Sequence, residues 1–576
     1  MVLVFALGLA GMVAGCGASS TSGLAGRDAG IEATDGRSND GKVIGVQMPS
    51  CEHAPTACDG TAVRACVDVP PGDGGVARQP GDVLELCDSA CSLGRCTTTA
   101  CAGAEGQDGL RGCRFYGVQV DNIDEDDSRN LMLLLSNATS MEVNARVEAR
   151  DADGTWDTLM TAVIAPAAGT RIELNRPVRD VGLTAAGAYR VETDGPVLAV
   201  QIVSDDAERK ARSSGGTVLR PAQALGARYL ALTYAGENSA TVAATPGSRG
   251  GAGEITIVAT TDDTVVQLEL SAAAAVVAGG GVLDPPPALY ESPPMNEGDV
   301  LQVFSTAPEG DLTGTVVTSQ MPIAVFSGNV FTTYGYDLSG SNGGDLATEQ
   351  LPPTASWGVE YVGARLSPQA GCDPFFGTGV GLWRVIAAED DTRVTISPAV
   401  GVSVDGPNLP TDLKFTLNAA GVQSFWTRGD LKPPTPADFV ATATGPILLA
   451  QWLDCEPGLS WGVDGRLSGG DFNFNLPPGF DPEVIVVRQA GQGITLDGRP
   501  LADARFQFAS PAQRYEVARL GAADLGPCDD ALDRCEHHLV GAAFGVTWRG
   551  MDVVCSFAVT APPAATCALP TAGCLK

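Results

Sequence analysis

The chain of 576 residues has a formal net charge of −32, contains 71 glycines and 38 prolines, and has 16 cysteines but only 3 histidines. The acidic excess argues against general affinity for nucleic acid or anionic lipid, because long-range repulsion opposes both. No histidine lies between residues 54 and 536, which excludes a Ser-His-Asp site or a histidine-bound catalytic metal from that span.

Residues 1–16, which read MVLVFALGLAGMVAGC, are apolar or small and too few to span a bilayer as a mature helix. They end in VAGC, which is similar to a bacterial lipobox, where the cysteine is lipidated and becomes the new N-terminus. Gly17 follows, and by resemblance to bacterial sorting rules this favours the outer membrane. We therefore predict that Cys16 is lipidated and that the protein is exported. The alternatives are an ordinary cleaved signal peptide and a buried apolar strand.

Residues 17–50 are rich in Gly, Ser, Thr, Ala and Asp and show no apolar periodicity. Such a segment cannot bury enough surface to order itself, so we predict a flexible tether.

Half of the cysteines lie in the region 51–113. They are Cys51, Cys58, Cys66, Cys87, Cys91, Cys96, Cys101 and Cys113. In an exported protein this density predicts a disulfide framework that replaces a core too small to hold alone. Zinc is the alternative, but thiolate sites belong to reducing compartments and only His53 is near. The pairing stays open, and a small module of this kind often serves as a stalk or spacer.

Three sequence markers recur in the rest of the chain. SQMPIAVFSG around Pro322 has relatives in TDGPVLAVQI around Pro196 and ATGPILLAQW around Pro446. Thr315–Thr318 and Ile323–Phe326 are expected as two β runs, because a proline, which lacks an N–H, marks a strand start or edge. LPPTASWGVEYV resembles LRPAQALGARYL, with a looser relative in LPPGFDPEVIVV, and IVATTDDTVVQL resembles VIAAEDDTRVTI. The common order and spacing predict a tandem array of one β module. The expected modules are 114–227, 228–356, 357–482 and a shortened fourth at 483–576, where AAFGVTWRG resembles MPIAVFSG.

The array consists of short β-branched or alternating runs separated by Gly, Pro, Asn and Asp turns. No sustained helical period appears. We therefore predict an all-β fold of tandem antiparallel β-sandwich-like modules after the small disulfide-rich module. The alternative is a β-propeller in which each module supplies a pair of four-stranded blades. The sequence shows no convincing half-period, which favours sandwiches.

The later cysteines give further disulfide candidates. Cys372 and Cys455 could form a bridge within the third module, and Cys528 and Cys535 could close a short loop. If Cys16 is lipidated, an odd number of cysteines remains, so one thiol would be free or intermolecular.

The catalytic alternatives are weak. GLSWG, centred on Ser460, matches the G-x-S-x-G string, but that motif needs a strand-to-helix turn and here a hairpin turn is expected. His537 and His538 beside Cys535 favour an exposed loop over a metal site. No phosphate-binding or dinucleotide motif appears, and nothing singles out a carboxylate pair for glycoside hydrolysis. We predict that the protein is not an enzyme.

Acidic stretches are interpreted as turns. The run Asp121–Asp127 could recruit calcium, but its spacing does not fit an EF-hand, so a solvated turn is expected. Asp262-Asp263 and Asp390-Asp391 occupy matching repeat positions and predict hairpin turns. No metal site and no cofactor are therefore expected, with calcium as the one cation that these residue types could attract.

The runs TGTVVTSQMPIAVFSGN, EQLPPTASWGVEYV, IVATTDDTVV and VIAAEDDTRVTI together resemble the N-terminal domain of the IgGFc-binding protein family over roughly residues 115–560. Family members usually carry Asp-His-Leu flanked by cysteine before Glu-Gln-Leu-Pro-Pro. Here Leu346 follows Asp345 and the loop 331–344 has no cysteine, so any role of that histidine is absent. The resemblance implies extracellular binding or matrix association.

Together these features predict a non-catalytic surface lipoprotein that binds an extracellular glycan or protein, with no nucleic acid partner and no small-molecule substrate. The alternatives are a structural or assembly component of the envelope and, least favoured, a carbohydrate-active enzyme. The binding face is expected around the loop 331–344, because aromatic residues on a Gly/Ser loop make good contacts. The residues proposed for it are Tyr334, Tyr336, Asp345, Glu349 and Trp357.

Overall fold

The computed structural model divides the chain into two units, Met1–Val43 and Ile44–Lys576. The first unit, with the predicted signal segment and Cys16, lies outside the described residues, as does the rest of the predicted tether. The described residues are 56–59, 61–69, 77–105, 109–121, 130–151, 153–178, 181–204, 215–234, 252–271, 274, 276–277, 279–281, 289–306, 311–332, 345–366, 381–429, 437–452, 459–464, 470–476, 483–525, 535–541, 543–549 and 554–558.

The cysteine-rich region forms small sheets joined by disulfides. Its elements are β1 (Thr56–Asp59), β2 (Ala62–Val69), β3 (Ala77–Leu86), β4 (Ala90–Ser92), β5 (Arg95–Thr97) and α1 (Thr99–Glu105). The disulfides join Cys58 to Cys91, Cys87 to Cys96 and Cys101 to Cys113, and Cys66 is also disulfide-bonded. The prediction of a disulfide framework is therefore confirmed, while Cys51, Cys372, Cys455 and Cys528 lie outside the described residues.

The first β module shows the plan that the others repeat. Its strands are β6 (Gly112–Gly117), β7 (Asn130–Asn137), β8 (Val143–Arg150), β9 (Trp156–Ile164), β10 (Ala168–Leu174), β12 (Tyr189–Ser204) and β13 (Gly215–Leu219). The first half of β12 pairs with β6 and β8, whereas the second half pairs with β7 and β13. One long strand therefore belongs to two sheets. The short β11 (Gly182–Thr184) pairs with β18 of the next module.

The second module has the same arrangement around β19. Its strands are β14 (Gly226–Leu230), β15 (Gly253–Ala259), β16 (Val266–Glu269), β17 (Leu289–Glu291), β18 (Val300–Phe304), β19 (Val316–Thr332) and β20 (Asp345–Gln350). The first half of β19 pairs with β14 and β16, and the second half pairs with β15 and β20. Short 3-10 turns, η1 (Ala222–Ala224) and η2 (Thr354–Ser356), precede β14 and the third module.

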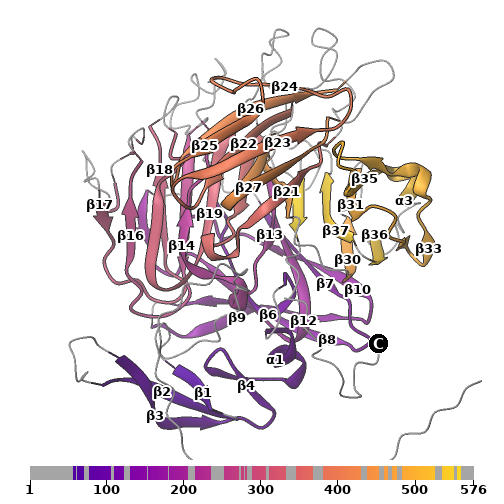
Figure 1. Ribbon diagram of the computed structural model, residues 1–576. Helices are drawn as coiled ribbons and strands as arrows, with labels where there is room; N and C mark the ends of the chain where they lie inside the picture. The colour runs from indigo at the N-terminus through magenta and orange to yellow at the C-terminus, as the bar shows by residue number, and fades with distance from the viewer. Residues whose placement is uncertain are drawn as a thin grey trace, which may run out of the picture. The chain divides into compact units, whose positions relative to one another are not determined.

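The third module repeats the plan around β27, whose neighbours can be followed in Figure 1. Its strands are β21 (Gly358–Gly363), β22 (Gly381–Ala387), β23 (Thr392–Pro398), β24 (Ser403–Asp405), β25 (Lys414–Leu417), β26 (Val422–Arg428), β27 (Phe439–Trp452), β28 (Leu459–Trp461) and β29 (Val463–Asp464). The first half of β27 pairs with β21 and β23, and the second half pairs with β22 and β28.

The fourth module splits the long strand in two. Its elements are β30 (Gly470–Leu476), β31 (Glu483–Gln489), β32 (Ile494–Leu496), β33 (Arg499–Pro500), η3 (Asp503–Arg505), β34 (Gln507–Phe508), β35 (Tyr515–Leu520), α3 (Ala522–Leu525), β36 (Cys535–Gly541), β37 (Ala543–Arg549) and β38 (Val554–Ala558). β36 pairs with β30 and β32, and β37 pairs with β31 and β38. The strand β30 therefore pairs within the fourth module, ahead of the expected boundary at residue 483. LPPTASWGVEYV leads into β21, the first strand of its module, whereas LPPGFDPEVIVV leads into β31, the second strand of the fourth module.

The recurring prolines lie where each long strand passes from one sheet to the other. In β12 the pairing with β6 shifts between Glu192 and Val197, on either side of Pro196. A proline has no N–H to donate to a ladder, so it fits where one set of partners ends and another begins. The two runs around Pro322, expected as separate strands, are thus the two halves of β19, and Thr260 donates a hydrogen bond of 2.6 Å to the Pro322 carbonyl.

The prediction of an all-β fold of antiparallel sheets is confirmed. In the large sheets several neighbouring strands are far apart in the chain, as in the order β6-β12-β8, whereas others, such as β8 and β9, are consecutive. A long strand shared by two sheets is consistent with the predicted sandwich-like modules, and the β-propeller alternative is not needed to explain the strand pairing.

Apolar clusters join the modules to one another. One cluster combines the core of the first module with Phe326 and Leu346 of the second, and another combines the second with Leu382 and Trp452 of the third. Val362 and Val440 of the third module pack with the fourth. The fourth also packs against the outer face of β7 and β12 in the first. The contacts between modules therefore form a closed cycle.

A buried tyrosine fixes the entry into the second module. The Tyr229 hydroxyl donates to the Ile323 carbonyl at 2.6 Å and accepts from the Gly226 N–H at 2.9 Å. In the third module the Tyr361 hydroxyl accepts from the Gly358 N–H at 3.0 Å. In the repeated Gly-x-x-Tyr pattern, the glycine N–H thus donates a hydrogen bond to the tyrosine hydroxyl at the start of a strand.

Replacing Tyr229 by Phe removes this hydroxyl and leaves two backbone groups without a partner. We expect Tyr229→Phe to lower the free energy of unfolding by about 1–3 kcal/mol, read from the midpoint of urea unfolding. The matched control is Tyr290→Phe, because Tyr290 lies in the same core but makes no hydroxyl hydrogen bond in the described part of the chain. Equal stability of the two variants would contradict the assignment.

Candidate functional site

The predicted ligand loop connects β19 to β20. The described pairing reaches Thr332 on β19 and Asp345 on β20, which face each other across the hairpin. Tyr334 and Tyr336 lie between them, outside the described residues. Asp345 is the first residue of β20, and its side chain is also outside the description. The place of the loop in the topology is therefore known, and its ligand contacts stay a prediction.

The other two predicted contact residues are buried. Glu349 is 1% exposed, and Trp357 is 3% exposed. The Trp357 indole N–H donates to the Pro352 carbonyl at 3.0 Å, and its ring belongs to the core shared by the second and third modules. Both side chains therefore have a packing role in this structure rather than a position on an exposed face.

Glu349 lies where β20 contacts β13 of the first module. Its Oε2 accepts a hydrogen bond of 2.5 Å from Thr217 Oγ1, and the same Thr217 oxygen accepts from the Gln350 N–H at 2.8 Å. Oε1 of Glu349 has no hydrogen-bond partner within the described ranges. One threonine thus joins two modules through a carboxyl group and a backbone amide.

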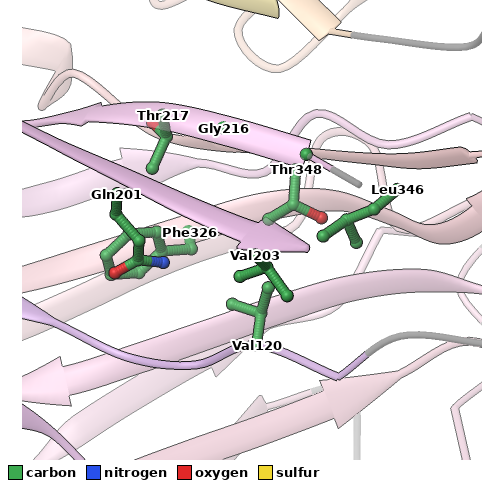
Figure 2. Close-up of a pocket in the computed structure, with 9 residues that line it drawn as sticks. Val120, Gln201, Val203, Gly216, Thr217, Phe326, Leu346 and Thr348 are labelled. Atoms are coloured by element: carbon green, nitrogen blue, oxygen red, sulfur yellow. The ribbon is translucent and has the colours of Figure 1, made fainter. Parts of the chain in front are cut away.

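A small cavity lies next to this contact. Figure 2 shows Thr217 and Gln201 of the first module opposite Thr348 and Leu346 of the second. The cavity offers about 10 Å³ to the centre of a water molecule, which is room for about one water. It is a gap in the packing between modules, too small for a sugar or a peptide side chain.

Burial raises the pKa of the Glu349 carboxyl well above its ordinary value, because a charged carboxylate is poorly solvated there. The Thr217 hydrogen bond and the nearby positive charge of Arg220 lower the pKa and offset this only in part. The direction of this shift suits a packed joint, since a protonated carboxyl leaves no buried charge to be compensated.

The first two modules are also joined through Glu297, in the loop before β18. Its Oε1 accepts from Arg190 at 2.8 Å and from the Tyr116 hydroxyl at 2.6 Å, and its Oε2 accepts from the Trp156 indole at 3.3 Å. The Arg190 guanidinium lies 3.9 Å from the centre of the Trp156 ring. Arg150 adds bonds to the Glu297 carbonyl and to Asp262.

The hydrogen bond to Arg150 lowers the pKa of Asp262, so this carboxylate is charged at neutral pH. Asp263 next to it has a φ of 58° and Asp391 has a φ of 54°. Both aspartates therefore occupy the left-handed conformation of tight turns, in agreement with the hairpin interpretation of the two repeat positions.

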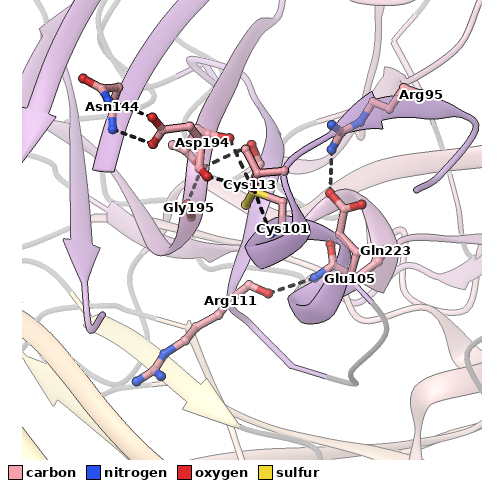
Figure 3. The surroundings of a disulfide bond; sticks show 11 residues. Arg95, Cys101, Glu105, Arg111, Cys113, Asn144, Asp194, Gly195 and Gln223 are labelled. Atoms are coloured by element: carbon pink, nitrogen blue, oxygen red, sulfur yellow. Dashed lines mark hydrogen bonds and ion pairs between the residues drawn. A yellow bond between two sulfur atoms is a disulfide. The ribbon is translucent and has the colours of Figure 1, made fainter. Parts of the chain in front are cut away.

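Figure 3 shows how the cysteine-rich region is held on the first module. The Cys101–Cys113 disulfide joins α1 to β6, and Thr98 Oγ1 donates to the Asp194 carbonyl at 2.9 Å. The Asp194 carboxylate accepts two bonds of 2.7 Å from Asn144. This region is therefore anchored by a covalent bond and by hydrogen bonds, which a free spacer would lack.

The remaining chemical candidates, Ser460, His537 and His538, lie on strands. Ser460 lies in the short strand β28 opposite Gln451, so the strand-to-helix turn of a nucleophile elbow is missing there. His537 and His538 lie in β36, opposite Phe474 and Asn473, instead of in the expected loop. Their side chains and those of Cys535 and its strand are not described. The described residues contain no group of His, Cys, Asp and Glu arranged to hold a metal.

The sequence did not single out Glu297 or its partners. Glu297 lies in SPPMNEGD, which reads as an ordinary acidic turn, and Arg190 and Trp156 lie in different strands of another module. No local spacing links residues this far apart, so only the packing of the two modules reveals the network.

Comparisons with known proteins agree with these features. A family model described as IgGFc binding protein matches residues 215–550, which run from β13 to the end of β37. A human protein described as IgGFc-binding protein is 25% identical over 323 residues, which is 54% of this chain and 5% of that protein. The chain thus spans about 5% of the length of that relative. The first module, which has the same strand plan, lies almost wholly before the matched residues.

The raised pKa of Glu349 predicts a pH-dependent stability. The folded state keeps its proton above the ordinary pKa of 4.5, whereas the unfolded state loses it, so this contribution to stability falls as pH rises. Glu349→Gln mimics the protonated carboxyl. We expect the midpoint of urea unfolding of the Glu349→Gln variant to rise relative to that of the wild type as the pH increases above about 4.5.

The control is Glu142→Gln at an exposed position, which should track the wild type across the same range. A constant difference between Glu349→Gln and the wild type at all pH values would show that the carboxyl is not held neutral.

Proposed function

The chain belongs to the IgGFc-binding protein family, and on that premise we propose that it is a non-catalytic binding protein of the cell exterior. The match over residues 215–550 carries this proposal, because it covers most of the β array. Three disulfides support an oxidising compartment, where such bonds form and persist. Among the described residues, no helix has both the length and the apolar composition needed to cross a bilayer.

The geometry supports binding through loops on a fixed scaffold. The strands that follow the long strand, or its second half in the fourth module, are β13, β20, β28 and β38, and they contact one another in a cycle. Each is joined to the long strand before it by a hairpin connection, and the connection 333–344 carries Tyr334 and Tyr336. Loops held by rigid strands are where proteins place recognition residues. We propose that these hairpin connections face the ligand, which is an extracellular protein or glycan.

The relative's name refers to the Fc region of IgG, and we do not extend that ligand to this chain. The proposed setting is a lipid-anchored protein at the outer membrane, held through Cys16 and lifted by residues 17–50. Surface display is compatible with the net charge of −32, which keeps a protein soluble and discourages nonspecific association.

Co-sedimentation tests the binding proposal. Purified protein lacking residues 1–16 is mixed with insoluble envelope and matrix material, with and without EDTA, and bound protein and released sugar are measured together. We expect saturable binding without sugar release. Sugar release would favour a carbohydrate-active enzyme, loss of binding in EDTA would indicate calcium, and absence of binding would favour a structural component with a protein partner in the envelope.

The ligand loop is tested in the same assay by the double change Tyr334→Ala and Tyr336→Ala. Losing two aromatic contacts should weaken binding by about tenfold or more. Replacing both tyrosines by Phe keeps the rings and should preserve most of the affinity. Unchanged affinity of the Ala variant would move the binding face away from this loop.

Lipidation is tested by growing cells that express the full chain with a labelled fatty acid. We expect label on the wild type and none on Cys16→Ser, together with release of the variant from the membrane fraction. Label retained by Cys16→Ser, or an unlabelled wild type, would contradict the anchor and favour an ordinary signal peptide.

A further inference from the structure

The strand β9 is an unusual edge strand. It spans nine residues and pairs only with β8 in the described part of the chain. The strands in the equivalent place of the other modules are short, with three residues in β17, four in β25 and two in β33. Native sheets keep exposed edges short or guarded, because a free row of N–H and C=O groups invites pairing with another chain. β9 departs from that rule.

Several of the exposed side chains of β9 are large and apolar. Leu159 and Met160 are each 41% exposed and Val163 is 59% exposed. Met141, in the turn before β8, is 68% exposed. No lysine or proline lies within the strand to discourage pairing. A bulge leaves Leu159 without a partner on β8, but Met160–Ile164 pair with Val143–Val147 without interruption, so a regular segment remains.

The start of β9 is fixed in place. Trp156, its first residue, donates to Glu297 of the second module and stacks under Arg190. Within the described residues, the backbone hydrogen bonds outside the ladder do not involve Trp156–Ile164, and the Ile164 carbonyl accepts from the Asn137 side chain at 3.1 Å. No second strand among these residues pairs with the outer edge of β9. An anchored strand with a free outer edge is preorganised for strand addition, since it loses little conformational freedom on binding.

The charges around this edge select the partner. Glu142, Asp153 and Asp157 are exposed and make no ion pair within the described ranges, whereas Arg146 and Arg171 lie beside Glu148 and Glu173. The uncompensated charge is negative, as it is for the whole chain. A second copy of this chain would bring like charges together, so self-pairing through β9 is disfavoured.

We propose that β9 is a docking edge for an extended segment of a partner protein, which adds to the sheet as a strand, places apolar side chains beside Met160 on one face of the sheet and Val163 on the other, and carries basic residues at its ends. A polypeptide fits this edge because it supplies alternating backbone donors and acceptors at the strand repeat. The proposal deepens the proposed binding function and rests on it.

The test uses a labelled short peptide in which valine and threonine alternate between terminal lysines. Purified protein lacking residues 1–16 is titrated by fluorescence anisotropy, and hydrogen exchange of the β9 amides is followed. We expect saturable binding with slowed exchange at Leu159–Val163, and at least about tenfold weaker binding of an analogue N-methylated at alternate residues, which cannot complete the ladder. A glutamate-ended analogue should also bind more weakly.

Two variants locate the edge. The first is the double variant Met160→Lys and Val163→Lys, which places positive charge on the edge strand and so discourages pairing. The second is the double variant Met160→Ser and Val163→Ser, which removes only the apolar contacts. Both variants should weaken peptide binding by about tenfold or more, because each disturbs the contacts at the strand edge. All four substitutions are at exposed positions, so we expect the fold to stay intact. The matched control is Leu289→Lys on β17, which is 56% exposed in the equivalent strand and should leave the affinity unchanged.

Three results would each overturn the proposal. They are absence of peptide binding, binding of the N-methylated analogue as tight as that of the unmodified peptide, and wild-type affinity in both β9 variants. So would concentration-dependent dimerisation that the lysine variant abolishes, because β9 would then pair with a second copy. The envelope co-sedimentation assay is run on the same variants. If sedimentation persists while the peptide fails to bind, the proposed function stands and only the β9 edge is excluded.

Discussion

The fold depends on one long strand in each of the first three modules that pairs with two sets of strands. In β12, β19 and β27 the chain pairs with one set of strands, passes a proline, and then pairs with another set. Because the strand is covalently continuous, the two sheets cannot separate without breaking ladder bonds on both sides of Pro196, Pro322 or Pro446. This shared strand explains why the most recognisable sequence repeat lies at the bend: the apolar run after each proline is buried in a sheet, whereas the proline ends the preceding ladder.

The joints between modules combine apolar contact with buried charge. Arg384 of the third module donates to Asp311 of the second at 2.9 Å, and Arg519 of the fourth donates to both oxygens of Asp438 of the third. Glu297 has the corresponding role between the first two modules. Buried ion pairs of this kind add little net stability but penalise a wrong alignment heavily, because a displaced partner leaves a charge uncompensated. We interpret them as setting the register of modules that apolar packing alone would hold less specifically. The fourth module packs on the first through an apolar cluster that includes Met132, Val200 and Val484.

A scaffold of this type keeps its interior closed and leaves recognition to its periphery. Glu349 and Trp357, whose residue types suggested ligand contact, are used for packing where modules meet. The exposed apolar groups of β9 and the hairpin connections after the long strands remain as surfaces through which a partner could be recognised. A strand edge offers backbone hydrogen bonds and the loops offer side-chain contacts, so one molecule could combine both modes.

The all-β class, the disulfide character of the cysteine-rich region and the repeat could be predicted from the sequence, because alternation, cysteine density and recurring motifs are local properties that can be recognised without knowledge of packing. The sequence placed the prolines correctly at a discontinuity but separated the halves of β19, since a proline looks the same whether a strand ends there or changes partners. It did not reveal that β30 pairs with β36, because that pairing is a contact between residues far apart in the chain. The burial of Glu349 and Trp357, the link that Glu297 makes between two modules and the position of β9 at the edge of the described sheet are visible only in the folded chain. Exposure depends on which modules pack together, and that packing is fixed by non-local contacts that no spacing within the sequence encodes.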